Sequence, residues 1–531
     1  MKGIKPLELD EAKLSELQLK LEKRELSEAD CEQLKALIDL LRFLGTHYQQ
    51  AKISMQRVLK MIFGSRTEKT DAVLKRNGAQ ESNPAGEKPK RKGHGRLGAD
   101  RYPGAERVHV AHELLRPGQK CPDCLKGLLR DTKRPSVVLR FCAQPVIKAT
   151  AYVLEQLRCA LCGKTFTTSA PAEAGMEKYD GNVAPMLAVL RYGFGMPMNR
   201  TADLQKMFGV PLALGTQWEL IKSCYDEVGA VIESELVKQA AAGSVLHNDD
   251  THGRVLDLEK QIRVRQEAAQ PGEKTRTGVF TTGVVSITEA GTIALYTTGS
   301  QHAGENLQDI LDHRPAALPT PIQMCDALSR NEPESETIMA NCNSHGRREF
   351  VDIAVPFPAE CEYALETYKL IYKHDAHAAA QSMTPAERLL YHQQKSKQPM
   401  EDMKRWMEQK LADHQVEPNG GLGKAFVYTL KHWEKLTRFL SVAGAPIDNN
   451  ICERALRTAI RHRDNSLFYK TLNGAKIGDF FMSVIHTCRL CGKDPFDYLT
   501  TVRRFVVQLT QNPSAWMPWN YQASAAGPPQ S

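Results

Sequence analysis

The sequence has no apolar run of the length that a membrane-spanning helix needs. Such a helix takes about 20 consecutive apolar residues, and no comparable run occurs in the 531 residues. The first 20 residues are charged throughout and hold no apolar stretch of the kind found in secretory signals. These two absences predict a cytosolic protein. In that compartment the 13 cysteines are expected to be thiols or metal ligands rather than disulfides.

The charge excess is too small to define a partner by itself. The net charge is +8 at pH 7, and charged residues make up 25% of the chain, an ordinary share for globular proteins. The excess is compatible with an anionic partner such as nucleic acid. Hydrophobic residues make up 42%, enough for several cores, and the length predicts roughly three or four domains.

Residues 8–63 have the pattern of a long helix. Ser27 and Asp30 give a weak capping signal. Apolar or aromatic residues then recur alternately every three and four positions from Leu34 to Ile62. This heptad seam favours pairing of two chains in a coiled coil, with packing of the helix on its own domain as the alternative. Residues 1–70 are therefore expected to join subunits.

A linker is expected over residues 71–106. Gly, Pro and polar residues dominate it from residue 77 onward, and it has no apolar period. Two interpretations of its basic cluster stay open: a solvated tether, or an arm that neutralises DNA phosphates. The cluster consists of Lys88, Lys90, Arg91, Lys92 and Arg96.

Two CxxC pairs lie among short strand-like runs in residues 107–172. Cys121 and Cys124 form the first pair, and Cys159 and Cys162 form the second. Each pair presents two thiolates to one ion, and two pairs complete a tetrahedral Zn²⁺ site. The alternative is two unrelated turns. In a cytosolic chain the pattern predicts a structural zinc.

A third CxxC pair, Cys488 and Cys491, is not expected to bind metal. It lies in a helical pattern, where buried cysteines are common. Cys342 and His345 form a CxxH that could join it in a second zinc site, but we favour the buried interpretation.

Residues 173–242 are predicted to be helical and to contain a helix-turn-helix. One helix runs through Phe208 and ends at Gly209, and a short turn leads to a second helix. An ordinary helical hairpin is the alternative. The candidate DNA-reading residues on the second helix are Thr216, Gln217 and Lys222.

From residue 243 the sequence predicts an α/β domain. Three strand-like runs occur in series: "SVLHNDDTHGRVL", "TGVFTTGVVSI" and "GTIALYTTG". A helix near 305–312, the strand "PIQMCDA", the run "ETIMANC" and the helical "HGRREFVDIA" follow. Residues 357–443 are again helical, with breaks near 384 and 420. The Pro-rich tail, residues 511–531, is expected to be loose.

Four acidic residues stand at strand ends or at a helix start in this domain. They are Asp249 and Asp250 after "SVLHN", Asp326 after "PIQMC", and Glu453 after "DNNIC". Singly, each has an ordinary structural explanation: a turn, or a capping box between Asn450 and Glu453. Together, carboxylates on adjacent strand ends and a nearby helix can hold the two divalent cations that phosphoryl transfer uses.

Arginines are concentrated near these acids in the sequence. They are suited to holding DNA phosphates, although such clusters are often simply surface. The candidates are Arg347, Arg348, Arg454, Arg457, Arg461 and Arg463.

The motifs "LHNDDT", "CNSHGRREF" and "PIDNNICERALRTAIRHRDNSLF", followed by "GKDPFDYL", resemble a known family. They are similar to those of the DDE transposases of bacterial insertion-sequence family sixty-six. "FGSRTEK" and the paired CxxC module fit the family's order, so the resemblance covers nearly the whole chain. The Asp-Asn-Asn-x-x-Glu-Arg block is its most specific part. The chain departs from the family at Asn343, often Trp, at Asp464, often Lys, and in "ALSRN" after Asp326.

The resemblance implies a ribonuclease-H-like catalytic domain, residues 243–356 and 444–510, with residues 357–443 as a helical insertion. It maps the catalytic acids onto Asp249, Asp326 and Glu453, which would bind two Mg²⁺ or Mn²⁺ ions, with Asp250 as a further candidate ligand.

The expected fold class is multidomain α+β. It comprises an N-terminal long helix or coiled coil, a zinc-binding β module, a helix-turn-helix-like domain, and the ribonuclease-H-like α/β domain with its insertion.

The implied activity is cleavage of DNA at the ends of an insertion sequence and joining of the freed 3′-OH to target DNA. Partners would be the element ends, target DNA, further copies of the chain and accessory proteins of the same element, in the bacterial cytoplasm at the nucleoid. Two rivals stay open. One is a catalytically inactive, zinc-containing DNA-binding regulator, and the other is a nuclease of the same fold that cuts without joining.

Overall fold

The computed structural model describes residues 165–270 and 275–521 without further gaps, and only short stretches before them. These stretches are residues 11–23, 26–35, 37–38, 117–120 and 146–158, with the single residues 122, 126 and 128. The four cysteines of the predicted zinc site, the basic cluster at 88–96 and most of the heptad seam lie outside the described residues. Within the described residues, no helix is long and apolar enough to cross a membrane.

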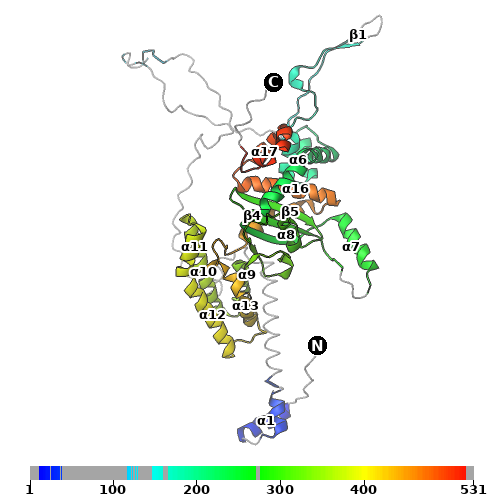
Figure 1. Cartoon of the computed structure of the whole chain (residues 1–531). Helices are drawn as coiled ribbons and strands as arrows, with labels where there is room; N and C mark the ends of the chain where they lie inside the picture. The colour runs from blue at the N-terminus through cyan, green and yellow to red at the C-terminus, as the bar shows by residue number, and fades with distance from the viewer. Residues whose placement is uncertain are drawn as a thin grey trace.

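A five-stranded mixed sheet lies at the centre of the molecule (Figure 1). Its order is β5-β4-β3-β6-β7. β3 (Val245–His252), β4 (Phe280–Ile287) and β5 (Thr292–Gly299) are antiparallel neighbours. β6 (Ile322–Cys325) and β7 (Ile338–Asn341) continue the sheet on the other side of β3 in parallel. These strands coincide with the five runs that the sequence predicted.

Helices cover both faces of this sheet. α6 (Leu214–Ala241) and α8 (Ala303–Leu311) pack on one face. α15 (Asn450–Ser466) packs on the other, against β3 and β4. The faces can be told apart by single contacts. Ser286 donates a hydrogen bond to Ala240 of α6, whereas a side chain added at Gly283 would meet Leu456 of α15.

The outer edge of β5 is covered by α16 (Leu472–Leu490). Three backbone N–H groups of this edge, those of residues 294, 296 and 298, donate to polar side chains of α16. The acceptors are Thr487, Ser483 and Asp479, which are spaced four residues apart on one side of the helix. A sheet edge without such partners would expose unpaired donors, so these side chains close the sheet.

The predicted helical segment after residue 357 is mainly helical, and its breaks near residues 384 and 420 were expected, whereas those at Ser396 and His432 were not. It consists of α10 (Pro358–Ala380), α11 (Pro385–Lys395), α12 (Lys397–Ala412), α13 (Gly421–Lys431) and the short α14 (Trp433–Leu436). α11 begins at a capping box between Thr384 and Glu387. The core of the whole helical segment is continuous with the β6–β7 end of the sheet, because Met403 and Phe426 share a buried cluster with Met324 and Ala340. α9 (Asn343–Ile353) precedes it.

Before the sheet, the chain forms the predicted pair of helices. α4 (Val183–Ala188) and a turn of π-helix (Val189–Gly193) lead to α5 (Met198–Met207), and Gly209 with φ +75° allows the turn into α6. Further upstream, β1 (Gln156–Arg158) and β2 (Thr165–Thr167) form a small antiparallel hairpin around residues 159–164. α1 (Glu11–Lys23) is followed by a second helical stretch, and Ser27 and Asp30 make the predicted reciprocal cap before it.

The expectation of a loose tail from residue 511 is wrong as far as residue 521. α17 (Pro495–Arg504) and α18 (Val506–Gln511) are followed by a 3-10 turn (Pro513–Trp516) that packs back on the core. Met517 and Tyr521 are buried, and Tyr521 donates to Asp497 at 2.7 Å. Aromatic and methionine side chains outweigh the prolines here because their burial is favourable. Residues 522–531 lie outside the described residues.

One helix between β3 and β4 had no counterpart in the sequence prediction. α7 (Leu256–Ala268) has a single buried residue, Ile262. Its apolar period is therefore too weak to identify, although acids in its first turn and Arg265 in its last are typical of helix ends.

Candidate functional site

β3 presents two adjacent carboxylates to opposite faces of the sheet. Asp249 pairs with Gly283 of β4, where α15 comes close: a Cβ at Gly283 would stand 2.9 Å from a methyl group of Leu456. Asp250 pairs with Thr282, whose hydroxyl accepts a hydrogen bond from Asn306 of α8. Because side chains alternate along a strand, Asp249 faces α15 and Asp250 faces α8.

Asp249 is half-buried among other acids. Burial, as the largest cause, and the negative charges of Asp326, Asp250 and Glu453 together raise its pKa to about 7. The backbone N–H of Asp250 stabilises the ionised form, because it donates to Asp249 Oδ1 at 2.8 Å. A carboxylate that is shielded from water and surrounded by negative charge is the electrostatic setting of a cation site.

Asp326 stands directly after β6, next to Asp249 in the sheet. β3 and β6 are parallel, and their last pair, His247 and Met324, lies two residues before each aspartate. Asn331 fixes Asp326, since its Nδ2 donates to Asp326 Oδ1 at 2.5 Å. Asn331 belongs to the "ALSRN" segment that departs from the commonest family version. The departure therefore includes the residue that orients this acid.

Glu453 lies in the first turn of α15, and Asn449 holds that helix end against β3. Asn449 is fully buried. Its Nδ2 donates to the carbonyl of Asn248 at 3.1 Å, and its Oδ1 lies 3.0 Å from Nδ1 of His247. Burial lowers the pKa of His247 to about 4, so its ring is neutral at pH 7 and Nδ1–H is the donor to Asn449.

The capping box predicted between Asn450 and Glu453 is absent. Asn449 is the N-cap residue, and its side chain makes no cap bond, because it is used in the contacts to β3. The side chain of Asn450 donates instead to Asp448 at 2.6 Å. The Glu453 side chain therefore does not cap the helix, and its Oε1 is buried without a hydrogen-bond partner.

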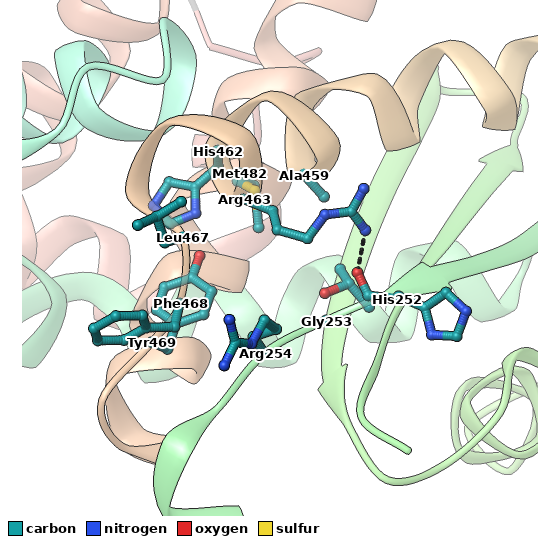
Figure 2. Close-up of a pocket in the computed structure, with 11 residues that line it drawn as sticks. His252, Gly253, Arg254, Ala459, His462, Arg463, Leu467, Phe468, Tyr469 and Met482 are labelled. Carbon is teal, nitrogen blue, oxygen red and sulfur yellow. Dashed lines mark hydrogen bonds between the residues drawn. The ribbon is translucent and has the colours of Figure 1, made fainter. Parts of the chain in front are cut away.

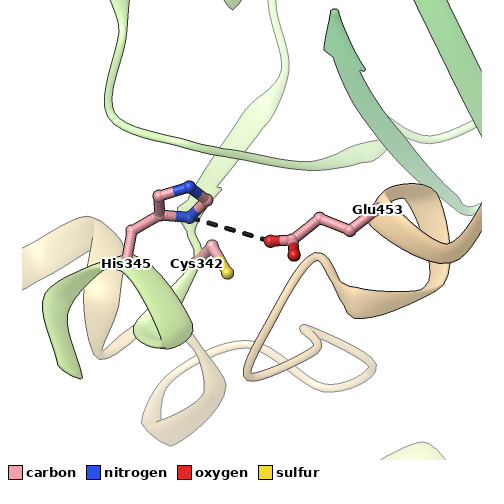
Figure 3. A group of neighbouring side chains, drawn as sticks. All are labelled: Cys342, His345 and Glu453. Carbon is pink, nitrogen blue, oxygen red and sulfur yellow. Dashed lines mark ion pairs between the residues drawn. The ribbon is translucent and has the colours of Figure 1, made fainter. Parts of the chain in front are cut away.

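The Glu453 side chain points toward His345 of α9 (Figure 3). Its Oε1 lies 3.9 Å from Nδ1 of His345, and Sγ of Cys342 completes a group whose ligand atoms lie within 4.8 Å of one another. Within the described part of the chain this is the one group of three possible ligands that close together. The charges of Asp326 and Glu453 therefore act on Asp249. The carboxylate oxygens of these three acids are, however, more widely spaced than the ligand atoms of the group with Cys342 and His345.

On the α8 face of the sheet, the carboxylate of Asp250 already has two partners. Its Oδ2 lies 3.2 Å from Nδ1 of His302, and its Oδ1 accepts from Arg330 at 3.1 Å. Its side chain is only 2% exposed. Phe280 lies against both partners, with its ring centre 4.4 Å from that of His302 and 5.8 Å from the Arg330 guanidinium. Asp250 therefore does not face the site of Asp249, which speaks against it as a shared metal ligand.

Three of the predicted arginines form an exposed row on α15. The exposed residues, at helical spacing, are Arg454, Arg457 and Arg461. These cations lie beside the face of α15 that carries Glu453 in its first turn. On α9, Arg347 and Arg348 are half-buried and already engaged by neighbouring groups.

Arg463 is used within the fold instead. Its Nη1 donates to the carbonyl of His252 at the end of β3 (Figure 2). It also donates, at 3.2 Å, to the hydroxyl of Thr251. A small cavity with a volume of about 20 Å³ is lined by residues that include Arg463, Arg254 and Tyr469. That volume admits about one water molecule, so this cavity does not accept a nucleobase in this conformation.

The predicted DNA-reading residues of α6 have different surroundings. Gln217 is buried and donates to the carbonyls of Met198 and Leu212, both at 3.1 Å. The expectation that it reads a base is wrong for this structure, because its amide joins α5 to α6. Lys222 is paired with Asp226 at 2.5 Å, and Thr216 is half-buried in the first turn.

Asn343, the position that departs from the family's frequent Trp, has a structural task. It is buried, and its Nδ2 donates to the carbonyls of Leu436 and Ile447. These bonds fasten the end of the helical segment and the approach to α15. Neither Asn343 nor Asn449 could be assigned from the sequence, since their partners lie about 100 or more residues away.

Cys488 lies in α16, in the helical pattern that the sequence indicated, and Cys491 is its half-buried C-cap residue. Cys488 is buried in α16, and the Sγ of Cys491 contacts the carbonyl of Thr292 at 3.7 Å. Among the residues that the structure describes, neither belongs to a metal-ligand group.

Comparison with known proteins assigns the chain to a class and to a family. A transposase domain is present, since residues 179–477 match the family model described as Transposase IS66 family. The match covers more than half of the 531 residues and includes Asp249, Asp326 and Glu453. The chain belongs to the IS66 transposase family, and the resemblance found in its motifs is confirmed.

The similar curated proteins come from Sinorhizobium fredii (strain NBRC 101917 / NGR234). The uncharacterized protein y4jD is 24% identical over 78% of this chain and 80% of its own length. The uncharacterized protein y4hP is 24% identical over 71% of this chain and 69% of its own. A third, y4qI, is 29% identical over 36% of each chain. No solved structure matches.

Proposed function

We propose that this transposase cleaves DNA at the ends of its element and joins the freed 3′-OH to target DNA, with Asp249, Asp326 and Glu453 as its catalytic acids. The observation that carries the proposal is the setting of Asp249. It is half-buried, its pKa is raised to about 7, and the charges of Asp326, Asp250 and Glu453 that act on it are negative. Such an arrangement is costly in a fold unless a cation enters it.

The residues present fit divalent metal ions, which the family implies. The three acids offer only hard oxygen ligands, as Mg²⁺ and Mn²⁺ prefer. Two ions held there would supply activation of the attacking oxygen and stabilisation of the leaving one. Asp249 and Asp326 would provide two carboxylates held in place by the sheet. Glu453 would provide the third, after its side chain rotates away from His345.

The protein's own contribution is positioning. Asn331 fixes Asp326, and Asn449 fixes the start of α15 on β3. In this proposal Arg454 and Arg457 bind DNA phosphates beside the site, since both are exposed on the helix that carries Glu453. Arg347 and Arg348 stabilise developing charge from α9.

The order β5-β4-β3-β6-β7 supports the ribonuclease-H-like interpretation of the catalytic domain, with α10 to α14 as its insertion. The remaining regions take their roles by the same proposal. Residues 107–172 form the zinc module, helped by the β1–β2 hairpin that brackets residues 159–164. Residues 1–70 pair subunits, and the basic linker contacts DNA phosphates.

The test is a cleavage and joining assay with Mg²⁺ on DNA that carries the element's own ends. Wild type is compared with Glu453→Gln and, as a matched control, Glu434→Gln on α14, an exposed acid of the same type. Joined products with wild type and with Glu434→Gln, but not with Glu453→Gln, support the proposal. Cut but unjoined DNA would point to a nuclease, and binding without cutting would point to an inactive regulator.

The zinc module needs a separate measurement. Zinc bound to wild type is compared with zinc bound to Cys121→Ser, and the loss of one ion per chain is expected. Equal zinc in the two proteins would reject the module.

A further inference from the structure

The group of Cys342, His345 and Glu453 has a composition different from that of a magnesium site. It combines a thiol, an imidazole and a carboxylate from two helices and the strand end before α9 (Figure 3). Thiol and imidazole ligands favour transition metals such as Zn²⁺, whereas Mg²⁺ is held by oxygens. The acids of the proposed catalytic set and this group share one member, Glu453.

The start of α9 places the side chains of Cys342 and His345 close to each other. Cys342 is the N-cap residue of α9, and His345 is three residues later in its first turn. These two positions face the same side of a helix start, as they do in a capping box. The backbone N–H of Asn449 donates to Sγ of Cys342 at 3.2 Å and so helps to fix its position.

Two atoms of the group lack hydrogen-bond partners. Oε1 of Glu453 and Nδ1 of His345 are both buried and without a hydrogen bond, although they face each other at 3.9 Å. Buried polar atoms are nearly always satisfied, so the pair marks a position where something binds between them. A zinc ion about 2.0–2.3 Å from each ligand needs ligand atoms roughly 3.3–3.8 Å apart. Small side-chain rotations bring the present separations, all within 4.8 Å, to that range.

We propose that Cys342, His345 and Glu453 form a transition-metal site, taking Zn²⁺ with a water as the fourth ligand, and that its occupation withdraws Glu453 from the catalytic acids. Binding replaces waters of the ion by the three side chains and releases the thiol proton of Cys342 to solvent. The metal site stands on its own geometry, but its inhibitory effect rests on the proposed catalytic role of Glu453. One carboxylate cannot serve both sites at once in the orientation seen here, so zinc and catalysis compete.

The first experiment counts zinc on the full-length protein by titration against a chromophoric chelator. Wild type is expected to hold one ion per chain more than Cys342→Ser or His345→Ala. Any zinc at the CxxC module is common to all three proteins and cancels. Matched controls are Cys361→Ser, a buried cysteine on α10, and His313→Ala, an exposed histidine after α8, and both should keep the wild-type count. Circular dichroism and thermal unfolding confirm that each variant is folded. Equal counts in wild type and His345→Ala overturn the proposal.

The second experiment measures DNA cleavage at fixed Mg²⁺ with increasing Zn²⁺. Each variant's rate is expressed relative to its own zinc-free rate. Wild type should be inhibited, and the zinc concentration for half inhibition should rise about tenfold or more in His345→Ala, a size typical for loss of one metal contact. The same midpoint in both proteins would overturn the competition.

The two proposals fail in different ways. If the additional zinc is present and lost in His345→Ala while Glu453→Gln still cleaves DNA, the metal site stands and the catalytic role of Glu453 falls. If no additional zinc binds and Glu453→Gln is inactive, the catalytic role stands and the zinc site falls.

Discussion

The two faces of β3 treat adjacent carboxylates in opposite ways. The side chain of Asp250 is buried beside Arg330 and His302, which satisfy it within the fold. Asp249 is half-buried beside Asp326 and Glu453, and its pKa is raised to about 7. The two residues are of the same type and adjacent on one strand, so the difference arises from the elements that pack on each face.

Under the proposed function, this difference separates a structural acid, Asp250, from a catalytic one, Asp249. A paired buried charge contributes to the fold, and removing it leaves its partners unpaired. An unpaired buried acid among like charges costs stability, and folds retain such groups mainly at functional sites. The predictions below test this distinction, from the largest expected effect to the smallest.

Asp249→Asn should abolish DNA cleavage, with a loss of at least about 10³-fold. Loss of a metal ligand removes several kcal/mol of transition-state stabilisation, and each 1.4 kcal/mol is about tenfold in rate. The measurement is the cleavage rate with Mg²⁺ on end-containing DNA. Retention of more than about a tenth of the wild-type rate would contradict the catalytic assignment.

The contribution of Asp249 to the stability of the metal-free protein should fall as the pH rises from about 4 to about 7. In this window unfolded Asp249, with its ordinary pKa of 3.8, is ionised, while the folded residue, with a pKa of about 7, keeps its proton. The folded state therefore binds more protons, and its stability falls with rising pH, by at most roughly 4 kcal/mol in total.

Denaturant unfolding of wild type and Asp249→Asn, measured across this window, isolates the effect. Buried Asp479, whose pKa is also raised to about 7, contributes equally to both proteins and cancels. Parallel curves for the two proteins would contradict the raised pKa of Asp249. Mg²⁺ should stabilise wild type more than the variant near pH 7.5.

Asn449→Ala should lower the cleavage rate about 10–100-fold, because α15 loses its bonds to β3 and Glu453 loses its position. Asn450→Ala is the matched control, since its side chain contacts only the neighbouring Asp448 and, at 3.5 Å, Ser344. Cleavage rates of the two variants are compared at equal folded fractions. Equal rates would show that Asn449 does not position the site.

Asp250→Asn should reverse the pattern of Asp249→Asn. Unfolding free energy should fall by about 1–2 kcal/mol, a value reduced by the partial exposure of Arg330 and His302. Cleavage should stay within about tenfold of wild type. A loss as large as that of Asp249→Asn would instead make Asp250 a metal ligand.

Much of the central sheet and of the helices around it could be predicted from local sequence. All five strands of the central sheet, α8, α9 and the helical segment from 358 to 440 follow apolar patterns and turn signals. α7 could not be predicted because only Ile262 of that helix is buried, and the end of the chain was wrongly judged by its prolines. Gln217 was misjudged because helix position alone does not reveal that Met198 and Leu212 accept its amide.

The sequence by itself determined the family and the candidate acids, including the adjacent Asp249 and Asp250. Only the tertiary structure decided that these two face opposite sides of the sheet, that Asp249 lies among acids and that Asp250 is paired with Arg330 and His302. It also decided that Glu453 turns to Cys342 and His345 rather than capping its helix. These outcomes depend on contacts such as Asn449 to Asn248, which join positions 201 residues apart, and no local pattern encodes them.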